Sequence, residues 1–320
     1  MFSQGEHETF QPDSDAVRRW MKPEQPEQTH DIPLKNLPEY LRAESEAFRK
    51  RYSTANFLYV LLDMPRIQGE AREKAVEKLE GFKYEPLIKD TRYPALTWHG
   101  PQLVHGGKGG DEALLDAWGE SDGEIVSAWI VSKARPQPLA RHLRKNVFVK
   151  DVSGQEFLLR YYDPKTLPIL HRVADQKWVE WFLFPIKAWW YPVATPTEEN
   201  WSRIQGSGRI GAPEPDVSLV IGEELWDALV SDPLAYEVLN VAEKKFPAAF
   251  ESKCYGVRLA QIENLLESAK ANGLEARADQ LAYAIALLGD PARADEPRWQ
   301  AAIQSAAAEE APLKTYFAQA

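Results

Sequence analysis

The residues best suited to chemistry in this sequence form a glycine-rich stretch, HGGKGG, at positions 105–110. Glycines with a lysine at the start of a helix can bind a phosphate through backbone N–H groups and the helix dipole. A P-loop, however, continues with Ser or Thr after its Gly-Lys pair, and a dinucleotide loop requires the spacing GxGxxG. The helix predicted here begins with Asp111 and Glu112, which repel a phosphate. We interpret the stretch as a flexible loop and keep an enzyme with a phosphorylated ligand as a lesser alternative.

The other residue types that bind metals or act as nucleophiles are scattered. None of the histidines belongs to an HExxH or paired His/Cys motif; they are His7, His30, His99, His105, His142 and His171. Asp63 could still form a site with His99 and His105 after folding, but scattered histidines more often have structural roles. Cys254 is the only cysteine, which excludes an internal disulfide and fits a reducing compartment. We therefore expect no catalytic residue, no cofactor and no metal.

The most distinctive segment is FLLRYYDP, at positions 157–164. Residues 157–161 are predicted to form a strand, and Asp163 and Pro164 then suit the N-cap and first position of a helix. Arg160, at the strand end, is placed to pair with a carboxylate, for which Asp63 and Asp163 are the candidates. A catalytic role for Arg160 and Asp163 is the alternative, but neither a nucleophile nor a metal motif stands beside them. We favour the structural role.

Aromatic residues are frequent, with 11 Trp, 12 Tyr and 12 Phe. Large aromatic side chains dominate both cores and protein interfaces, so their number fits a packed protein or a binding protein. The run at 178–193 is predicted to form strands broken by Pro185, and alternation along a strand can expose half of its side chains. The candidates for contact with a partner protein are Trp189, Trp190, Tyr191, Trp226, Tyr236, Phe250 and Tyr255.

The elements that must position these residues fall into four segments. Residues 1–35 are rich in Pro, Glu and Gln and are expected to form a flexible acidic tail. Residues 36–192 alternate short apolar runs with helical patterns, which is typical of an α/β domain built on a mixed sheet with flanking helices. Residues 193–216, rich in Pro, Thr, Gly and Ser, are predicted to be a linker or long loop. In residues 217–320 the apolar side chains recur at helical spacing, which predicts an all-helical lobe.

Charge and hydrophobicity narrow the function classes further. The formal net charge of −10 disfavours nucleic-acid binding, in which Lys and Arg neutralise phosphates. The sequence has neither a polybasic membrane anchor nor an apolar run long enough to span a bilayer. Its first residues do not follow the pattern of a signal peptide. We expect a cytoplasmic protein that binds other proteins rather than membranes or nucleic acids.

Four segments, in their order and spacing, resemble the type VI secretion effector-adaptor family of bacteria, also called Tap or Tec chaperones. They are YVLLD at 59–63, GPQLV at 100–104, RHL at 141–143, and LLRYYDP at 158–164 followed by the aromatic strand that reaches 189–190. LLRYYDP is the specific part, and the resemblance covers residues 56–191. The motif residues, to which we assign structural roles, are Asp63, Gly100, Pro101, Arg160, Tyr161, Asp163 and Pro164.

The resemblance implies a protein that is not an enzyme. Members of that family bind a toxic effector protein, deliver it to the VgrG spike and are not themselves exported. The resemblance also implies an α/β lobe that carries the motifs, followed by a helical lobe. We expect the helical lobe to supply the effector groove and the α/β lobe to face the spike, although the aromatic residues of the helical lobe would equally suit packing between lobes. An immunity protein that neutralises a cognate toxin is the main alternative function.

Overall fold

The computed structural model describes residues 31–52, 58–107, 109–119, 125–209, 217–230, 233–252 and 254–318. The predicted acidic tail, residues 1–35, lies outside this part of the chain apart from its last five residues. Those five are ordered: strand β1 (Ile32–Pro33) pairs with a strand near residue 200, and a short 3-10 helix, η1 (Leu34–Asn36), follows it. The tail prediction is therefore wrong for these residues, because a sheet edge provides hydrogen-bond partners for them.

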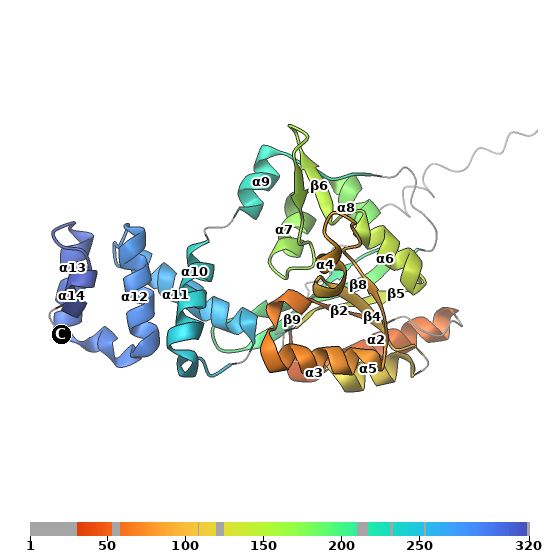
Figure 1. Cartoon of the computed structure of the whole chain (residues 1–320), viewed down its shortest axis with the longest axis horizontal. Helices are drawn as coiled ribbons and strands as arrows, with labels where there is room; N and C mark the ends of the chain where they lie inside the picture. The colour runs from red at the N-terminus through yellow and green to blue at the C-terminus, as the bar shows by residue number, and fades with distance from the viewer. Residues whose placement is uncertain are drawn as a thin grey trace, which may run out of the picture. The chain divides into compact units, whose positions relative to one another are not determined.

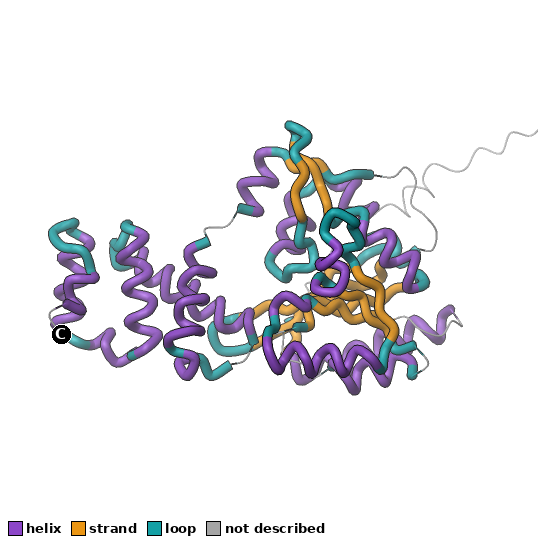
Figure 2. Tube along the Cα trace, viewed as in Figure 1, coloured by secondary structure: helices purple, strands orange, loops and turns teal. Residues whose placement is uncertain are grey.

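Seven strands form one sheet in which every pair of neighbours is antiparallel (Figures 1 and 2). The strand order is β1-β9-β8-β5-β2-β4-β3. The remaining strands of this sheet are β2 (Leu58–Leu62), β3 (Lys83–Pro86), β4 (Gln102–His105), β5 (Val126–Ser132), β8 (Ile186–Ala194) and β9 (Glu199–Gln205).

The central strands β2 and β5 are buried along their whole length because both faces of the sheet are covered. In β2, Tyr59 and Leu61 belong to one core, whereas Leu58, Val60 and Leu62 belong to the core on the other face. The first face is covered by α6 (Pro136–Arg144), α7 (Thr166–Val173) and α8 (Gln176–Phe182), and the second by α2 (Leu37–Tyr52), α3 (Gly69–Glu80) and α5 (Gly110–Trp118) (Figure 1). The predicted fold class, a sheet with flanking helices, is confirmed, and its main sheet is antiparallel.

A second, three-stranded sheet lies beside α7. Strands β6 (Phe148–Asp151) and β7 (Glu156–Leu158) form a hairpin, and β10 (Val220–Ile221) pairs with β6 in parallel. Helix α9 (Glu223–Leu229) then packs against α7, and α4 (Pro94–His99) precedes β4. Residues 217–229 therefore pack with the strands rather than with the C-terminal helices, so the all-helical part begins later than the predicted residue 217.

Two further predictions about residues 178–216 are corrected. Residues 178–182 belong to helix α8 instead of a strand, because the Asp175 side chain accepts hydrogen bonds from the backbone N–H groups of Lys177 and Trp178 and so caps the helix. Residues 199–205 form β9, which pairs with β8 from Glu199 to Gln205, so they are not a linker. The Pro- and Thr-rich signal there marks only the turn at 195–198, and residues 210–216 lie outside the described residues.

The C-terminal part is helical, as predicted. It consists of α10 (Leu234–Lys245), α11 (Tyr255–Ala271), α12 (Arg277–Gly289), α13 (Pro297–Ala307) and α14 (Lys314–Ala318), with the 3-10 helices η3 (Pro247–Ala249) and η4 (Pro291–Asp295). One small core lies among α10, α11 and α12, and a second surrounds Trp299 of α13. Within the described ranges, none of the helices has the length and apolar character that a membrane span requires.

Helix α11 contacts strand β8, and residues 31–320 form one compact unit. We call residues 31–230 the sheet region and residues 233–318 the helical region. The contact of α11 with β8 and the ion pair of Glu263 with Lys165 bring the helical region beside the turn that ends the LLRYYDP motif.

Candidate functional site

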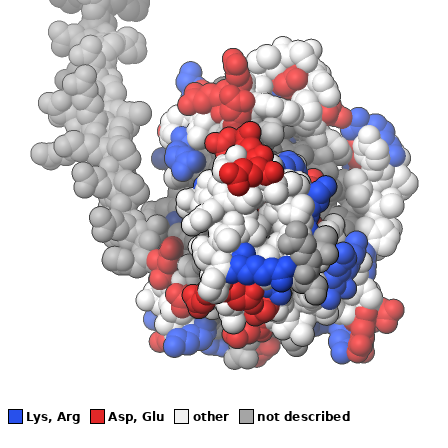
Figure 3. Space-filling model, turned by 90° about the vertical axis from the view of Figure 1, so that its left-hand side faces the viewer, with Lys and Arg blue, Asp and Glu red and all other residues white. Residues whose placement is uncertain are grey.

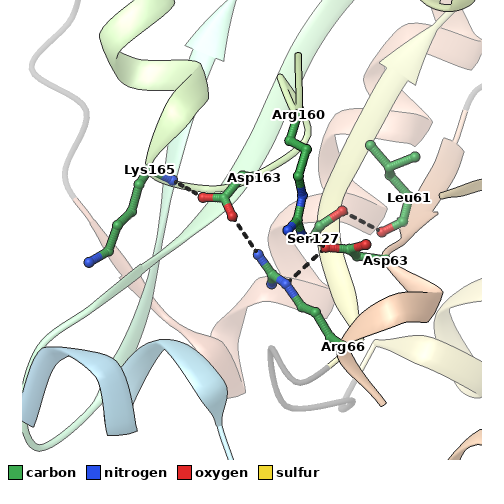
Figure 4. A network of polar contacts seen from close by, with 7 residues as sticks. All are labelled: Leu61, Asp63, Arg66, Ser127, Arg160, Asp163 and Lys165. Atoms are coloured by element: carbon green, nitrogen blue, oxygen red, sulfur yellow. Dashed lines mark hydrogen bonds and ion pairs between the residues drawn. The ribbon is translucent and has the colours of Figure 1, made fainter. Parts of the chain in front are cut away.

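A network of ion pairs joins the end of β2 to the segment that follows β7 (Figure 4). The carboxylate of Asp63 is fully buried, and its Oδ2 accepts a hydrogen bond of 2.6 Å from Nη2 of Arg160. The same oxygen lies 3.0 Å from Nε of Arg66, whose Nη2 lies 3.4 Å from Oδ2 of Asp163. Two guanidinium groups and two carboxylates thus balance one another, which is what allows charges to be buried here.

The local structure of the β2 end explains the position of Asp63. Its backbone N–H donates to the carbonyl of Ile125, and the hydroxyl of Ser127 donates to the carbonyl of Leu61 at 3.0 Å (Figure 4). The short 3-10 helix η2 (Met64–Arg66) then turns the chain so that Arg66 points back towards Asp63. The strand end and the turn together fix both partners of the first ion pair.

The second half of the network lies in the turn before α7. Oδ1 of Asp163 accepts a hydrogen bond of 2.9 Å from the backbone N–H of Lys165, and the Asp163 carbonyl accepts from Thr166 and Leu167. Helix α7 begins at Thr166, so Asp163 stabilises a turn rather than the helix N-cap, and Pro164 lies in that turn rather than at the first helical position. The strand predicted for 157–161 ends at Leu158.

Of the two carboxylates considered as partners of Arg160, Asp63 and Asp163, the structure pairs Arg160 with Asp63. Asp163 is partly buried, whereas Arg160 is exposed but hydrogen-bonded. The Arg160 side chain is 45% exposed and its guanidinium lies 5.6 Å from the ring centre of Tyr162. Burial by itself lowers the pKa of Arg160, but Asp63, Tyr162 and Asp163 together outweigh this effect and raise that pKa above its ordinary value. Arg160 therefore remains charged and holds the motif segment against the sheet.

Tyr161 points into the core on the other side of the same segment. Its ring centre lies 5.2 Å from that of Phe182 and 6.2 Å from that of Trp189, and the side chain is fully buried. Burial raises the pKa of its hydroxyl well above the ordinary value. These contacts support the structural role assigned to Tyr161.

Gly100 and Pro101 form a tight connection between α4 and β4. The N–H of Gly100 donates to the carbonyl of Leu96, and a Cβ added at position 100 would lie 2.4 Å from that carbonyl oxygen. The carbonyl of Pro101 accepts a hydrogen bond of 2.9 Å from Leu87. Only glycine fits at position 100 without a shift of the backbone. The contacts of Gly100 and Pro101 are thus consistent with structural roles.

The HGGKGG stretch connects β4 to α5. Gly110 has a positive φ of 70°, and a Cβ added to Gly106 would overlap the Gly110 carbonyl. At the start of the following helix, Asp111 accepts hydrogen bonds from the hydroxyl of Ser45 and the N–H of Leu58 and is buried. The described glycines therefore close a tight turn that brings a buried acidic residue against β2. Lys108 lies outside the described residues.

A cavity of about 330 Å³ lies next to the ion-pair network. Its lining includes Arg66 and Asp163, and its opposite wall is formed by residues of α10 and α11. Three of the seven predicted contact residues line it, namely Tyr191, Tyr236 and Tyr255. The fold therefore brings together tyrosines from β8, α10 and α11 beside the motif segment.

The other four predicted contact residues lie elsewhere. Trp189 and Trp190 are 1% and 6% exposed, so neither can contact a partner in this fold. They belong to the cores on opposite faces of the sheet, because successive side chains of β8 alternate. Trp226 is 40% exposed and packs on Phe157. Phe250 is half-buried against the core among α10, α11 and α12.

Sequence reasoning missed three charged residues of this site. Arg66 bridges both carboxylates of the network, and its guanidinium lies 5.5 Å from the ring centre of Tyr255. The Lys165 ammonium pairs with Glu263 of α11. Arg66 could have been found from its place three residues after Asp63, because two buried carboxylates need a second cation. No local signal connects Lys165 to Glu263, which lies 98 positions further along the chain.

The histidines that could have met Asp63 have other neighbours. His99 contacts Arg72, and Nδ1 of His105 accepts a hydrogen bond from the N–H of Gly107. In the described part of the chain, no cluster of three or more His, Cys, Asp and Glu side chains is arranged to hold a metal ion.

Comparison with known proteins gives one match. No curated protein and no solved structure matches the chain. Residues 58–179 match the model of a family described as "Domain of unknown function (DUF4123)". The match starts with β2 and ends within α8, so it contains all four motif segments and all four members of the ion-pair network. The segment of this chain that builds the network is thus similar to DUF4123, and the helical region lies outside the match.

Proposed function

We propose that this chain is a non-enzymatic adaptor of bacterial type VI secretion that binds an effector protein in the cytoplasm and loads it on the VgrG spike. One observation carries the proposal: residues 58–179, with all four motif segments, match a domain that is associated with type VI secretion adaptors. Separately from this match, the order and spacing of the motifs resemble those of the type VI secretion effector adaptors.

The environments of the motif residues support a framework role for the matched segment. Ion pairs within the chain neutralise the charges of Asp63, Arg160 and Asp163. Aromatic rings enclose the side chain of Tyr161. A rigid frame of this kind suits a protein that must present fixed surfaces to other proteins. The sheet region and the helical region offer two such surfaces for two partners.

The charge distribution also suits protein contacts. On the face shown in Figure 3, Lys and Arg side chains alternate with Asp and Glu around an uncharged area, and neither sign dominates. The polar rim of an interface between proteins can contain charges of both signs. A groove for nucleic acid would instead concentrate positive charge.

The proposal is tested by deleting the gene in its native host and comparing the exported proteins by mass spectrometry. We expect one effector to disappear from the medium while other type VI substrates are still exported, and plasmid-borne expression to restore it. Affinity purification of the tagged chain should capture that same effector together with VgrG. An unchanged set of exported proteins would contradict the adaptor function. Unchanged export combined with new sensitivity to a toxin would identify an immunity protein instead.

A further inference from the structure

The cavity beside the ion-pair network has walls from both regions of the molecule. On the sheet side, the lining consists of Arg66, the turn at 163–165 with Pro168, and the end of β8 at 191–194. On the helical side, Tyr236 of α10 and residues 254–263, which include the first turns of α11, complete it. At about 330 Å³ the cavity is at the small end of the range for ligand sites, about 300–1,000 Å³. It can hold a few side chains but not a whole helix.

The charged residues of the lining are already paired with one another or with the network. Arg66 interacts with Asp63 and Asp163, and Lys165 pairs with Glu263. The lining therefore contains two cations and two anions, each with a partner inside the protein. An ionised guest would have to bury its charge without a counter-ion, which is strongly unfavourable. Because the charges of the lining already neutralise one another, the cavity favours an uncharged ligand.

The uncharged part of the lining is apolar but carries hydroxyl groups. Prolines 164, 168 and 192 with Val193, Ala194, Leu259 and Ala260 provide the apolar surface. Burial raises the pKa of Tyr236 to about 12 and also raises that of Tyr255, so both hydroxyls stay neutral. Among the described residues, none forms a hydrogen bond with either hydroxyl. A ligand with peptide groups and apolar side chains would contact the apolar lining and also form hydrogen bonds with the two hydroxyls. A pure hydrocarbon could not form those hydrogen bonds.

We propose that this cavity binds a short, uncharged segment of the effector, which inserts one or two large apolar side chains between β8 and α11 and hydrogen-bonds through its backbone to Tyr236 and Tyr255. The inference rests on the proposed adaptor function and adds to it the site and the chemistry of the bound segment. Because the guest touches both regions, its binding also strengthens their contact. Large apolar anchors seated in a pocket commonly dominate the affinity of a protein interface.

The test uses the effector identified by the deletion experiment, purified, and the full-length chain. Ala260→Trp places a large ring in the cavity, whereas Ala271→Trp adds the same ring at an exposed position near the end of the same helix. We expect Ala260→Trp to weaken effector binding at least about tenfold in calorimetry. Ala271→Trp should bind as the unmodified chain does, and both variants should still bind VgrG. Tyr236→Phe keeps the ring and removes only the hydroxyl, and it should weaken binding about fivefold.

Other results would overturn the inference in distinguishable ways. A folded Ala260→Trp variant together with Tyr236→Phe, both binding the effector at full strength, would show that the effector binds elsewhere. Absence of any effector that depends on the unmodified chain would overturn the proposed function and this site with it. A photo-reactive benzoylphenylalanine at position 255, which lines the cavity and already carries an aromatic ring, should form a crosslink to the effector in cells. A crosslink to residues 1–30 of the same chain, or a small apolar molecule recovered from the cavity, would identify a different occupant and overturn the proposal.

Discussion

The sheet region and the helical region bury polar groups in different ways. In the sheet region, buried carboxylates such as Asp63 and Asp111 are matched by charged or hydroxyl side chains from distant segments. In the helical region, buried polar side chains bond to the backbone: Asp279 accepts from the N–H of Leu313, and Gln280 donates to the carbonyl of Leu274. The first arrangement requires particular residue types at particular places, whereas apolar helix packing tolerates many sequences of similar volume. This difference gives a physical reason why recognisable motifs occur in the sheet region.

The largest effect is expected from an aromatic residue in the core of the sheet region. Trp189→Ala should lower the free energy of unfolding by about 3–5 kcal/mol, because the indole is 1% exposed and its removal leaves a cavity beside Tyr161 and Phe182. Chemical denaturation followed by circular dichroism measures this change. Trp226→Ala, at a 40% exposed position, is the control and should cost about 1 kcal/mol or less. Equal losses for the two variants would contradict the division between core and surface aromatic residues.

Breaking the ion-pair network should have the next largest effect. Asp63→Ala leaves Arg66 and Arg160 without their shared carboxylate, and we expect the free energy of unfolding to fall by about 3 kcal/mol. Glu70→Ala removes a carboxylate from an exposed i,i+4 pair with Lys74 and should change stability by about 0.5 kcal/mol or less. Urea titrations of both variants test this. If Asp63→Ala were as stable as Glu70→Ala, the network would not be what holds the motif segment.

The pattern of apolar residues predicted most elements of both regions. The spacing of apolar residues in 37–52, 69–79 and 111–118 predicts helices, and helices α2, α3 and α5 match these ranges within about two residues. The Ser153-Gly154 pair is a turn signal that indicates the hairpin of β6 and β7, and the position of Arg160 at a strand end indicates a pair with Asp63 or Asp163, because both signals are local. Local features therefore account for the part of the site that lies within the LLRYYDP motif and its carboxylate partner.

The remaining parts depended on contacts that no local pattern contains. The aromatic run at 178–182 suits a strand or a helix equally well, and only the cap at Asp175 decides for the helix. The sequence of β9 lacks the alternating pattern of a strand, because its two large apolar residues, Trp201 and Ile204, are three positions apart and pack in the cores on opposite faces of the sheet. The cavity arises from the docking of α11 on β8, to which residues far apart in the chain contribute.

A smaller difference in stability is expected between replacing a glycine in a tight turn of the sheet region and replacing one at an open position of the helical region. Gly100→Ala places a methyl group 2.4 Å from the Leu96 carbonyl oxygen and should cost about 2 kcal/mol. Gly289→Ala, at the end of α12, meets no atom within 4 Å and should leave stability unchanged or raise it by up to about 1 kcal/mol. Thermal unfolding of the two variants measures the difference. A stable Gly100→Ala variant would mean that the connection between α4 and β4 can relax.

The smallest effect concerns the ion pair that links the two regions. Lys165 and Glu263 are 41% and 40% exposed, so water and salt screen their attraction, and the entropy of holding two long side chains opposes it. A double-mutant cycle with Lys165→Ala and Glu263→Ala should therefore give a coupling free energy of about 0.5 kcal/mol in 0.1 M salt, falling towards zero in 1 M salt. Residues 192–194 of β8 and Leu259 and Ala260 of α11, which line the same cavity, are apolar. The double variant should therefore keep the helical region attached, with an unchanged pattern of limited proteolysis. A coupling above about 2 kcal/mol would instead mean that charge, rather than apolar packing, holds the helical region against the sheet region.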